Sequence, residues 1–480
     1  MRLPILALAL YAAPALASEG PTRDRPGEVM PDRHWDVRHL DLDVTIDPEA
    51  GTISGTATHT VIPLGRRSGH LRLDQTALDI TEVRIGGVVV EGWRTRPGVL
   101  EIPVPVRGDQ LEVAVDWSAQ PETGIHFRVP DDGADRILEA WTHGQAEDNQ
   151  YWFPCWDYPN DRFTYSATIT APEALHATTN GALLETAPAT PGWTRWSYAL
   201  EQSIPAYLVA LAVGDYAVYT EPAPVPLEFI VPAYVSQEQA HLTTGITGAS
   251  VAWFNKVLGT NYPYPVYRQL FVQRFLYGGM ENASLTVLSH RFLVPTDGDR
   301  GVHAEMVLVH ELAHQWFGDL LTCYGWREVW LNESFASYYA ARWQAETRGP
   351  EFFATTLYGW HENALTEQAP LAVRSWARVG DRDSASAGTL YGRGGVLLHM
   401  LRKHLGDEVF DAAIRAYVRD NQGRLVESSD FRRALEDASG THLGWLFDQF
   451  VYRHQFREVR TAWTWEDARL EVVLEQVGQG

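Results

Sequence analysis

Residues 301–321 read GVHAEMVLVHELAHQWFGDLL, and their pattern decides the fold class of the surrounding chain. Apolar residues recur here at steps of three and four, which is the spacing of one face of an α-helix. The six positions of this stripe are Val302, Met306, Val309, Ala313, Trp316 and Leu320. The stretch therefore predicts one amphipathic helix that buries its apolar side.

The same helix carries His310, Glu311 and His314 in an H-E-x-x-H pattern. Imidazoles at i and i+4 project from one helix face, close enough to bind a single ion. Two neutral imidazoles and one carboxylate suit zinc and leave its fourth position for water. Glu311 would lie beside the ion and accept a proton from that water. A surface helix with a histidine pair is the alternative interpretation.

Glu333 is the strongest candidate for the third ligand. It begins the next predicted helix, WLNESFASYYAARWQAETRGP, at residues 330–350. A reversal through Gly318-Asp319 and Gly325 would return the chain antiparallel to the first helix. Considered alone, Glu333 fits equally well as a carboxylate that stabilises a helix N-terminus. The H-E-x-x-H pattern upstream favours the ligand.

Outside this region the hydrophobic period changes along the chain. In HLDLDVTID (39–47) apolar and polar residues alternate, and similar short runs separated by turn residues follow. Residues 33–222 therefore predict an all-β domain. Residues 223–455 predict a mainly helical domain, with further helices at 242–259, 394–406, 410–421 and 429–439 and strands around Gly278. The fold class predicted is multidomain α+β.

The two ends of the chain have different patterns. Arg2 and the apolar run LPILALALYAAPALA, closed by Ala15-Leu16-Ala17, predict a signal peptide over 1–17 and export to the periplasm or the extracellular space. Residues 18–32 are polar and proline-rich, and we interpret them as a linker. Residues 456–480 look like one hairpin, which alone is marginal in water. We expect it to begin a truncated, β-rich C-terminal domain.

Composition excludes some partners. The formal net charge is −22 over 480 residues, which argues against nucleic acid as a partner. No segment after the signal reaches the ~20 apolar residues of a membrane span, so we expect no integral membrane segment in the mature chain. Cys155 and Cys323 are the only cysteines. Export permits a bond between them, but their aromatic neighbours favour two buried free thiols.

Four motifs, in a fixed order, resemble one protein family. They are YWFPCWDYPNDR (151–162), GGMEN (278–282), HELAHQWFGDL followed by WLNESFASYY (310–339), and TLYGRGGVLLHML (389–401). Together they resemble the gluzincin aminopeptidases, the family of aminopeptidase N and leukotriene hydrolase. The resemblance implies an N-terminal β-sheet domain, then a thermolysin-like, mainly α-helical zinc metallopeptidase domain. It also implies C-terminal domains that are mostly missing here.

The resemblance carries catalytic roles to matching residues. His310, His314 and Glu333 would be the ligands of one Zn²⁺, and Glu311 the general base. Tyr391 would donate to the oxyanion that forms when zinc-activated water attacks the peptide carbonyl. One such donor typically contributes about 2.7–4 kcal/mol. Without the resemblance, Tyr391 is interpreted as a core residue before a helix.

The GGMEN motif implies where the substrate amine binds. Glu281 would hold the free α-ammonium of a peptide. Gly278 and Gly279 would let the substrate backbone approach an edge strand and extend the sheet. Met280 and Asn282 complete this predicted substrate-binding motif.

Three positions in the other motifs qualify the resemblance. Gln145 matches a family glutamine that contacts the same amine, and its alternative interpretation is an ordinary loop glutamine. The family commonly has lysine where Arg393 stands, which keeps the charge but changes the geometry. An arginine frequent in the first motif's segment is Gln150 here, which affects local ion pairing.

The resemblance thus implies an exported zinc aminopeptidase acting on peptides with a free N-terminal amine. An endopeptidase would also cleave acetylated peptides, and Glu281 argues against that activity. A bifunctional epoxide hydrolase and aminopeptidase of the leukotriene-hydrolase kind shares GGMEN and is the second candidate. The complete set of ligands, base and tyrosine disfavours a non-catalytic binding module. The preferred N-terminal side chain and the oligomeric state do not follow from the sequence.

Overall fold

The computed structural model describes residues 31–65, 68–105, 110–130, 136–295, 298–366, 370–372, 388–453 and 458–477. The predicted signal peptide (1–17) and nearly all of the predicted linker (18–32) lie outside these ranges. Within them, every helix is too short or too polar to cross a membrane.

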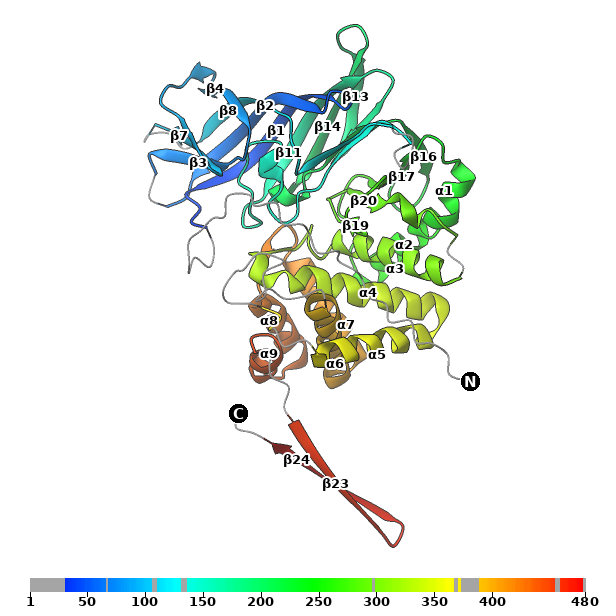
Figure 1. Cartoon of the computed structure of the whole chain (residues 1–480). Helices are drawn as coiled ribbons and strands as arrows, with labels where there is room; N and C mark the ends of the chain where they lie inside the picture. The colour runs from blue at the N-terminus through cyan, green and yellow to red at the C-terminus, as the bar shows by residue number, and fades with distance from the viewer. Residues whose placement is uncertain are drawn as a thin grey trace.

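The first domain is built from β-strands, as the alternating pattern predicts (Figure 1). Its largest sheet has the order β13-β14-β11-β1-β2-β8-β4-β5. The alternating residues Leu40, Leu42, Val44 and Ile46 of β1 are all buried. The strands of this sheet are β1 (Trp35–Asp47), β2 (Thr52–Pro63), β4 (Asp79–Ile85), β5 (Val88–Val89), β8 (Leu111–Ala119), β11 (Phe163–Pro172), β13 (Ala182–Pro188) and β14 (Trp193–Ile204).

Two smaller sheets complete this domain. One has the order β12-β15-β10-β9 and the other β3-β7-β6. Their strands are β3 (His70–Asp74), β6 (Arg94–Arg96), β7 (Val99–Pro103), β9 (Ile125–Arg128), β10 (Glu139–Thr142), β12 (His176–Thr179) and β15 (Leu211–Gly214).

The second domain combines a five-stranded sheet with a layer of helices. The sheet has the order β16-β17-β18-β20-β19, which makes the two-residue β19 an edge strand. Its strands are β16 (Tyr216–Glu221), β17 (Leu227–Pro232), β18 (Tyr267–Val272), β19 (Gly279–Met280) and β20 (Leu285–Ser289). Because β16 pairs with β17, the change of sheet comes between β15 and β16, a few residues before the predicted boundary at 222.

The helices lie on the side of this sheet away from the first domain (Figure 1). They are α1 (Gln237–Thr244), α2 (Thr247–Leu258), α3 (Gly298–His314), α4 (Trp330–Arg348), α5 (Pro350–Thr366), α6 (Gly394–Leu405), α7 (Asp407–Asp420), α8 (Ser428–Ser439) and α9 (Gly444–Phe450). Between α3 and α4 a short strand, β21 (Thr322–Cys323), pairs with β22 (Leu425–Val426). A turn of π-helix, η5 (Gly388–Arg393), leads into α6.

Two predicted helices differ from those observed. The helix predicted over 242–259 is divided into α1 and α2 at Gly245, and α2 ends at Gly259 with a left-handed φ of 68°. The helix with the apolar stripe ends at His314, so Trp316 and Leu320 belong to the following turn. Gly318 reverses the chain there at a φ of 131°. Both turn residues are still buried, so a burial pattern alone does not reveal the helix end.

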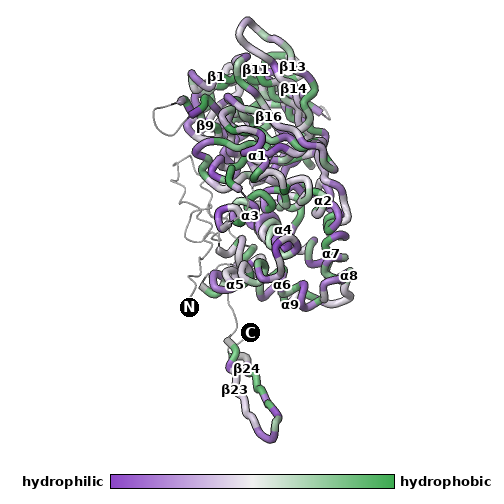
Figure 2. Tube along the Cα trace, turned by 90° about the vertical axis from the view of Figure 1, so that its right-hand side faces the viewer, coloured by the Kyte–Doolittle hydropathy of each residue, from purple (hydrophilic) through white to green (hydrophobic). Residues whose placement is uncertain are grey.

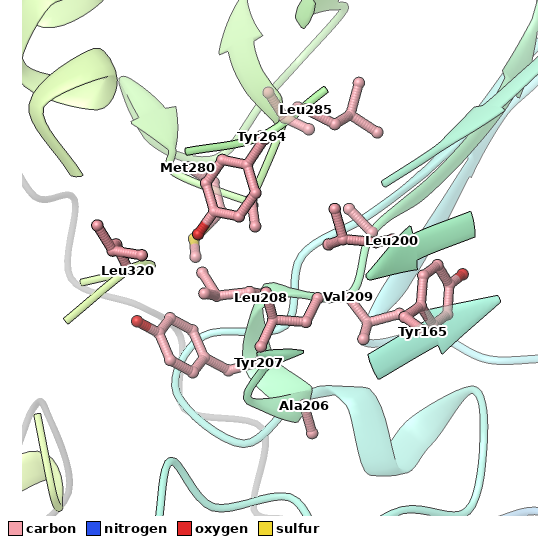
Figure 3. Packing of buried hydrophobic residues seen from close by; sticks show 14 of the residues in the cluster. Tyr165, Leu200, Ala206, Tyr207, Leu208, Val209, Tyr264, Met280, Leu285 and Leu320 are labelled. Carbon is pink, nitrogen blue, oxygen red and sulfur yellow. The ribbon is translucent and has the colours of Figure 1, made fainter. Parts of the chain in front are cut away.

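The two domains share one continuous hydrophobic core. Figure 3 shows Leu208 and Val209 between Leu200 of β14 and Met280 of β19. Cys155 and Cys323 are both buried free thiols, as their aromatic neighbours predict.

Arg162 makes a polar connection across the same boundary. It is the last residue of the YWFPCWDYPNDR motif and is half-buried. Its guanidinium donates to the carbonyl of Asp319 at 2.8 Å, to the hydroxyl of Thr322 and to the carbonyl of Ser203. The turn after α3 is thereby fixed to the β-sheet domain.

The hairpin of β23 (Glu458–Glu466) and β24 (Arg469–Val477) projects from the rest of the chain in both overall views (Figures 1 and 2). Trp463 and Leu474 are each 68% exposed. That this hairpin begins a further β-rich domain stays a prediction.

Candidate active site

Three side chains from two helices converge on one point. His310 and His314 come from α3, and Glu333 comes from the first turn of α4. The two Nε2 atoms are 3.0 Å apart, and Glu333 Oε2 lies 3.3 Å from His310 Nε2 and 3.4 Å from His314 Nε2. In tetrahedral zinc coordination neighbouring ligand atoms are about 3.3–3.5 Å apart. The triangle therefore fits one zinc ion.

The hydrogen bonds of the two imidazoles also fit a metal site. His314 Nδ1 lies 2.9 Å from the carbonyl of Phe317, which only accepts, so Nδ1 carries the proton. His314 therefore turns its other ring nitrogen, Nε2, towards Glu333, and this is the nitrogen left to bind a cation. His310 Nδ1 is 3.3 Å from the hydroxyl of Ser337, one turn along α4 from Glu333. Both rings are thus oriented through the nitrogen that faces away from the ion.

The Glu333 carboxyl is ionised, as a ligand of a metal cation must be. Burial opposes ionisation, but His314 and His310 hold the pKa of its carboxyl well below the usual range. Glu333 Oε2 makes no hydrogen bond of good geometry in the described part of the chain. An ionised, buried oxygen without a proton donor is what a cation would complete.

Glu311 packs directly against the edge strand. A Cβ added at Gly279 would lie 2.5 Å from Glu311 Cγ and closer still to the carboxylate. Any side chain at this position of β19 would therefore displace Glu311. Burial raises the pKa of the Glu311 carboxyl well above its usual range, and the neighbouring carboxylates of Glu281 and Glu333 add to the increase. A bound cation would lower it again.

Glu281 stands at the end of β19, 3% exposed. One of its carboxylate oxygens lies within 4.8 Å of ligand atoms of Glu311 and His314. Burial raises its pKa to about 7, an increase that His314 opposes and Glu333 reinforces. Glu281 Oε1 has no hydrogen-bond partner among the described residues. The site thus contains a buried acidic oxygen without a donor, next to the metal ligands.

The backbone around Glu281 is held from two directions. Gln315, the residue after His314, donates to the Glu281 carbonyl at 2.9 Å and accepts from the Ser284 amide at 2.9 Å. Asn180, in the turn after β12, donates to the carbonyl of Ala283 at 2.7 Å. The first domain therefore helps to position the segment that carries Glu281.

Tyr391 lies in η5, beside the metal-ligand candidate His310. Its ring centroid is 5.6 Å from that of His310. Burial raises the pKa of the Tyr391 phenol well above its usual range, and nearby carboxylates, Glu333 first, raise it further. The phenol therefore keeps its proton and is available as a donor. Ser334, next to Glu333, donates to the Leu390 carbonyl at 2.6 Å and so fixes the turn that carries Tyr391.

The remaining predicted residues lie around this centre in different ways. Gly278 precedes β19 and has open space beside it, because an added Cβ would meet Val307 only at 3.6 Å. The Met280 side chain lies in the core rather than in the site, so only its backbone is at the edge (Figure 3). Asn282 is completely buried, and its amide has no hydrogen-bond partner within the described ranges.

Gln145 is in the loop after β10 and is half-buried. Two residues earlier, His143 stacks on Tyr277 with ring centroids 4.7 Å apart. The loop of Gln145 therefore lies beside the segment that leads into GGMEN. Arg393, where the family commonly has lysine, donates to the carbonyl of Arg453 at 2.8 Å and so holds the chain after α9.

Sequence reasoning missed four residues that orient the site. They are Asn180, Gln315, Ser334 and Ser337. Three of them are in the quoted motifs, directly after a ligand or one helical turn from it, so their position was a usable signal. Asn180 gives no such signal, because its contact joins segments about a hundred residues apart.

Two histidines and a glutamate around one point, with a second glutamate beside them, define a zinc hydrolase site. Comparison with known proteins assigns the chain to one family within this class. Residues 36–208 match the Peptidase M1 N-terminal domain, and residues 243–450 match the Peptidase family M1 domain. The chain therefore belongs to peptidase family M1, whose members use a zinc ion.

Curated relatives agree with this assignment. Aminopeptidase N of Streptomyces lividans is 28% identical over 427 residues, which are 85% of this chain and 49% of that protein. Aminopeptidase B of Rattus norvegicus is 31% identical over 442 residues, 83% of this chain and 65% of that protein. The chain thus spans about half of the first of these relatives and just under two thirds of the second. They give no specific support to the epoxide-hydrolase alternative.

Solved structures share the fold. An M1 zinc metallopeptidase from Deinococcus radiodurans, solved as a mutant with a Tyr-Ser-Ala substrate, has a TM-score of 0.74 at 24% identity and covers 88% of this chain and 95% of that one. Aminopeptidase A of Legionella pneumophila has a TM-score of 0.81 at 20% identity, covering 93% of this chain and 53% of that one.

Proposed function

We propose that this chain is an exported zinc aminopeptidase that removes the N-terminal residue from peptides. The observation that carries the proposal is the buried, donor-free oxygen of Glu281 beside the metal ligands. An α-ammonium group offers up to three donors and one positive charge. It would satisfy this oxygen and offset the cost of burying the carboxylate.

The short distance from Glu281 to the ligands determines which bond is cut. In a peptide the α-nitrogen and the first carbonyl carbon are two bonds, about 2.5 Å, apart. A carboxylate whose oxygen lies within 4.8 Å of Glu311 and His314 atoms can therefore hold the amine only when the first peptide bond is at the metal. Edge strand β19 would align the substrate backbone in an extended conformation.

Each remaining residue has one task in the hydrolysis. When bound, zinc polarises the substrate carbonyl and lowers the pKa of its water to about 7. Glu311 takes the proton released during attack and passes it to the leaving amine. The protonated phenol of Tyr391 donates to the oxyanion.

Export is the second part of the proposal. It rests on the sequence of residues 1–17, with a basic residue, an apolar run and Ala15-Leu16-Ala17. Expression with its own N-terminus in a bacterium tests it. Appearance of mature protein that starts at Ser18 in the periplasm or the medium is expected, and retention of the full chain in the cytoplasm would contradict export.

Matched substrates test the activity. Aminoacyl and N-acetyl-aminoacyl fluorogenic amides should differ by orders of magnitude in kcat/KM, because acetylation removes the charge that Glu281 binds. Glu281→Ala should lose this preference while keeping its zinc content, measured by metal analysis. Equal rates on free and acetylated substrates in the parent protein would refute the role of Glu281.

A second variant separates chemistry from binding. Glu311→Gln keeps the shape of the side chain but cannot take up the proton. It should retain zinc and lose turnover by at least about 10²-fold. Full activity in this variant would refute the mechanism while leaving the metal site intact.

A further inference from the structure

A second cavity lies in the helical layer of the catalytic domain, away from the zinc ligands. It has a volume of about 430 Å³, and its walls come mainly from α2, α4, α5, α6 and α7. Of its twelve lining residues, all in the described part of the chain, none belongs to the site above. Arg342 of its wall is nine residues beyond Glu333 on α4, about 13 Å along the helix axis. The cavity is therefore a separate site.

The lining is strongly basic. It contains five cations and a single carboxylate, Glu346. The whole chain carries a net charge of −22 and has only two lysines, Lys256 and Lys403. Both of them line this cavity. All other basic side chains with a fixed charge in this chain are arginines, so its two ammonium groups both lie at this cavity.

Part of this charge is not neutralised by the protein. Arg342 is paired with Asp411 at 2.8 Å, and Arg402 is paired with Asp407 at 2.8 Å. Lys256 and Lys403, in contrast, are both exposed, and neither has an ion pair or hydrogen bond within the described residues.

Arg415, on α7, completes the unpaired set. Among the described residues it donates to the carbonyl of Val257, at 3.4 Å, and its side chain is exposed. The three unpaired cations outnumber the one carboxylate, so the cavity has a net positive charge.

A neighbouring imidazole is affected by this charge. His399 of α6 lines the same cavity between Phe353 and the cations, with ring centroids of His399 and Phe353 5.2 Å apart. Its pKa is lowered to about 4, first by burial and then by Lys403 and Arg402. Burial, the largest cause, opposes a charge of either sign, so only the smaller contributions of Lys403 and Arg402 report the positive charge of the cavity.

Helix dipoles explain only part of the arrangement. Lys256 lies in the last turn of α2 and Lys403 in the last turn of α6, where a cation gains roughly 0.3–1 kcal/mol. Arg342 and Arg415, however, are in the middle of α4 and α7. Helix-end stabilisation does not account for the convergence of cations from four helices on one cavity.

We propose that this cavity binds a small multivalent oxyanion of the phosphate type, held by Lys256, Lys403 and Arg415. Ammonium groups bind phosphate as point charges and can donate in any direction, whereas an arginine fork adds planar, bidentate donors. Trp253 and Phe353 provide apolar walls beside these cations, so the ligand has room for an organic group. Bulk chloride, with one charge and no fixed acceptor geometry, is a poor competitor.

The two lysines make the proposal directly measurable. Acylation of the zinc-loaded protein with an N-hydroxysuccinimide ester labels Lys256, Lys403 and the α-amino group, and mass spectrometry quantifies each one separately. Inorganic phosphate is titrated in at constant ionic strength set with sodium chloride. Both lysines should become protected with one common midpoint, while the α-amino group is unaffected. This readout does not involve the zinc site.

Matched variants test the cations one at a time. In Lys403→Ala, phosphate should protect Lys256 about tenfold more weakly, the loss expected for one charge-assisted hydrogen bond. Lys403→Arg should restore most of the affinity. Arg419→Ala removes an exposed cation from the same helix as Arg415 but outside the cavity, and should match the parent. Unchanged acylation of both lysines at saturating phosphate would overturn the proposal, as would equal weakening in Arg419→Ala.

Discussion

Replacing Gly279 by alanine is the sharpest test of the site geometry. The new Cβ would lie 2.5 Å from Glu311 Cγ, whereas ordinary contact begins at 3.4 Å. Glu311 must therefore retreat by about 1 Å. The clash is with the far part of a flexible side chain, so the fold accommodates it by moving Glu311. A misplacement of about 1 Å in a catalytic group costs about 10²-fold in rate, or nearly 3 kcal/mol.

The assay compares Gly279→Ala with Gly278→Ala. At Gly278 the nearest atom to an added Cβ is Val307 Cγ1 at 3.6 Å, so this alanine fits. We expect kcat to fall about 10²-fold in Gly279→Ala and to stay close to the parent value in Gly278→Ala. Zinc content and melting temperature should be nearly unchanged in both variants. A kcat of Gly279→Ala close to the parent value would refute the argument that Glu311 needs a bare backbone at this position.

Three further predictions concern other contacts. Ser337→Ala removes the partner of His310 Nδ1 and should weaken zinc binding about 10–100-fold in chelator competition; unchanged affinity would contradict the orienting role. Ser334→Ala frees the turn before Tyr391 and should lower kcat more than it raises KM, whereas a pure KM effect would contradict it. Burial lowers the pKa of His59 to about 4. Its contribution to stability is therefore complete above about pH 6.5 and is lost as the pH falls towards 4, by about 3 kcal/mol. Denaturant unfolding of His59→Gln between pH 7 and pH 4 should show a flatter dependence than the parent, and an equal slope would contradict this.

Local pattern predicted the main elements because their cause is local. The alternation around Leu40 reports a sheet with one buried face, and the stripe around Val309 reports one buried helix face. Hydrophobic periodicity did not predict the end of a helix where buried residues continue beyond that end. Trp316 keeps the helical spacing but follows the helix end, because Gly318 reverses the chain while the same core continues. Gly245 similarly divided a single predicted helix.

The site was predictable as far as motifs extend along the chain. Spacing identified His310 and His314 as a pair, and the predicted antiparallel return of the chain into the next helix brought Glu333 to them. Hydrogen bonds between distant segments could not be predicted from local sequence. The bond from Asn180 to the Ala283 carbonyl, just after GGMEN, is an example. The second cavity was equally invisible, because its cations come from four helices and meet only in the folded chain.

The bond from Asn180 to the Ala283 carbonyl has a consequence for evolution and engineering. In the proposed function, the segment that carries Glu281 sets the cut one residue from the N-terminus of the peptide, and this segment is hydrogen-bonded to a domain that folds from a different part of the chain. A change in the turn after β12 can therefore shift Glu281 without altering a single residue of the zinc motif. Libraries that vary only the catalytic domain would leave Asn180 unchanged, and with it this means of moving Glu281.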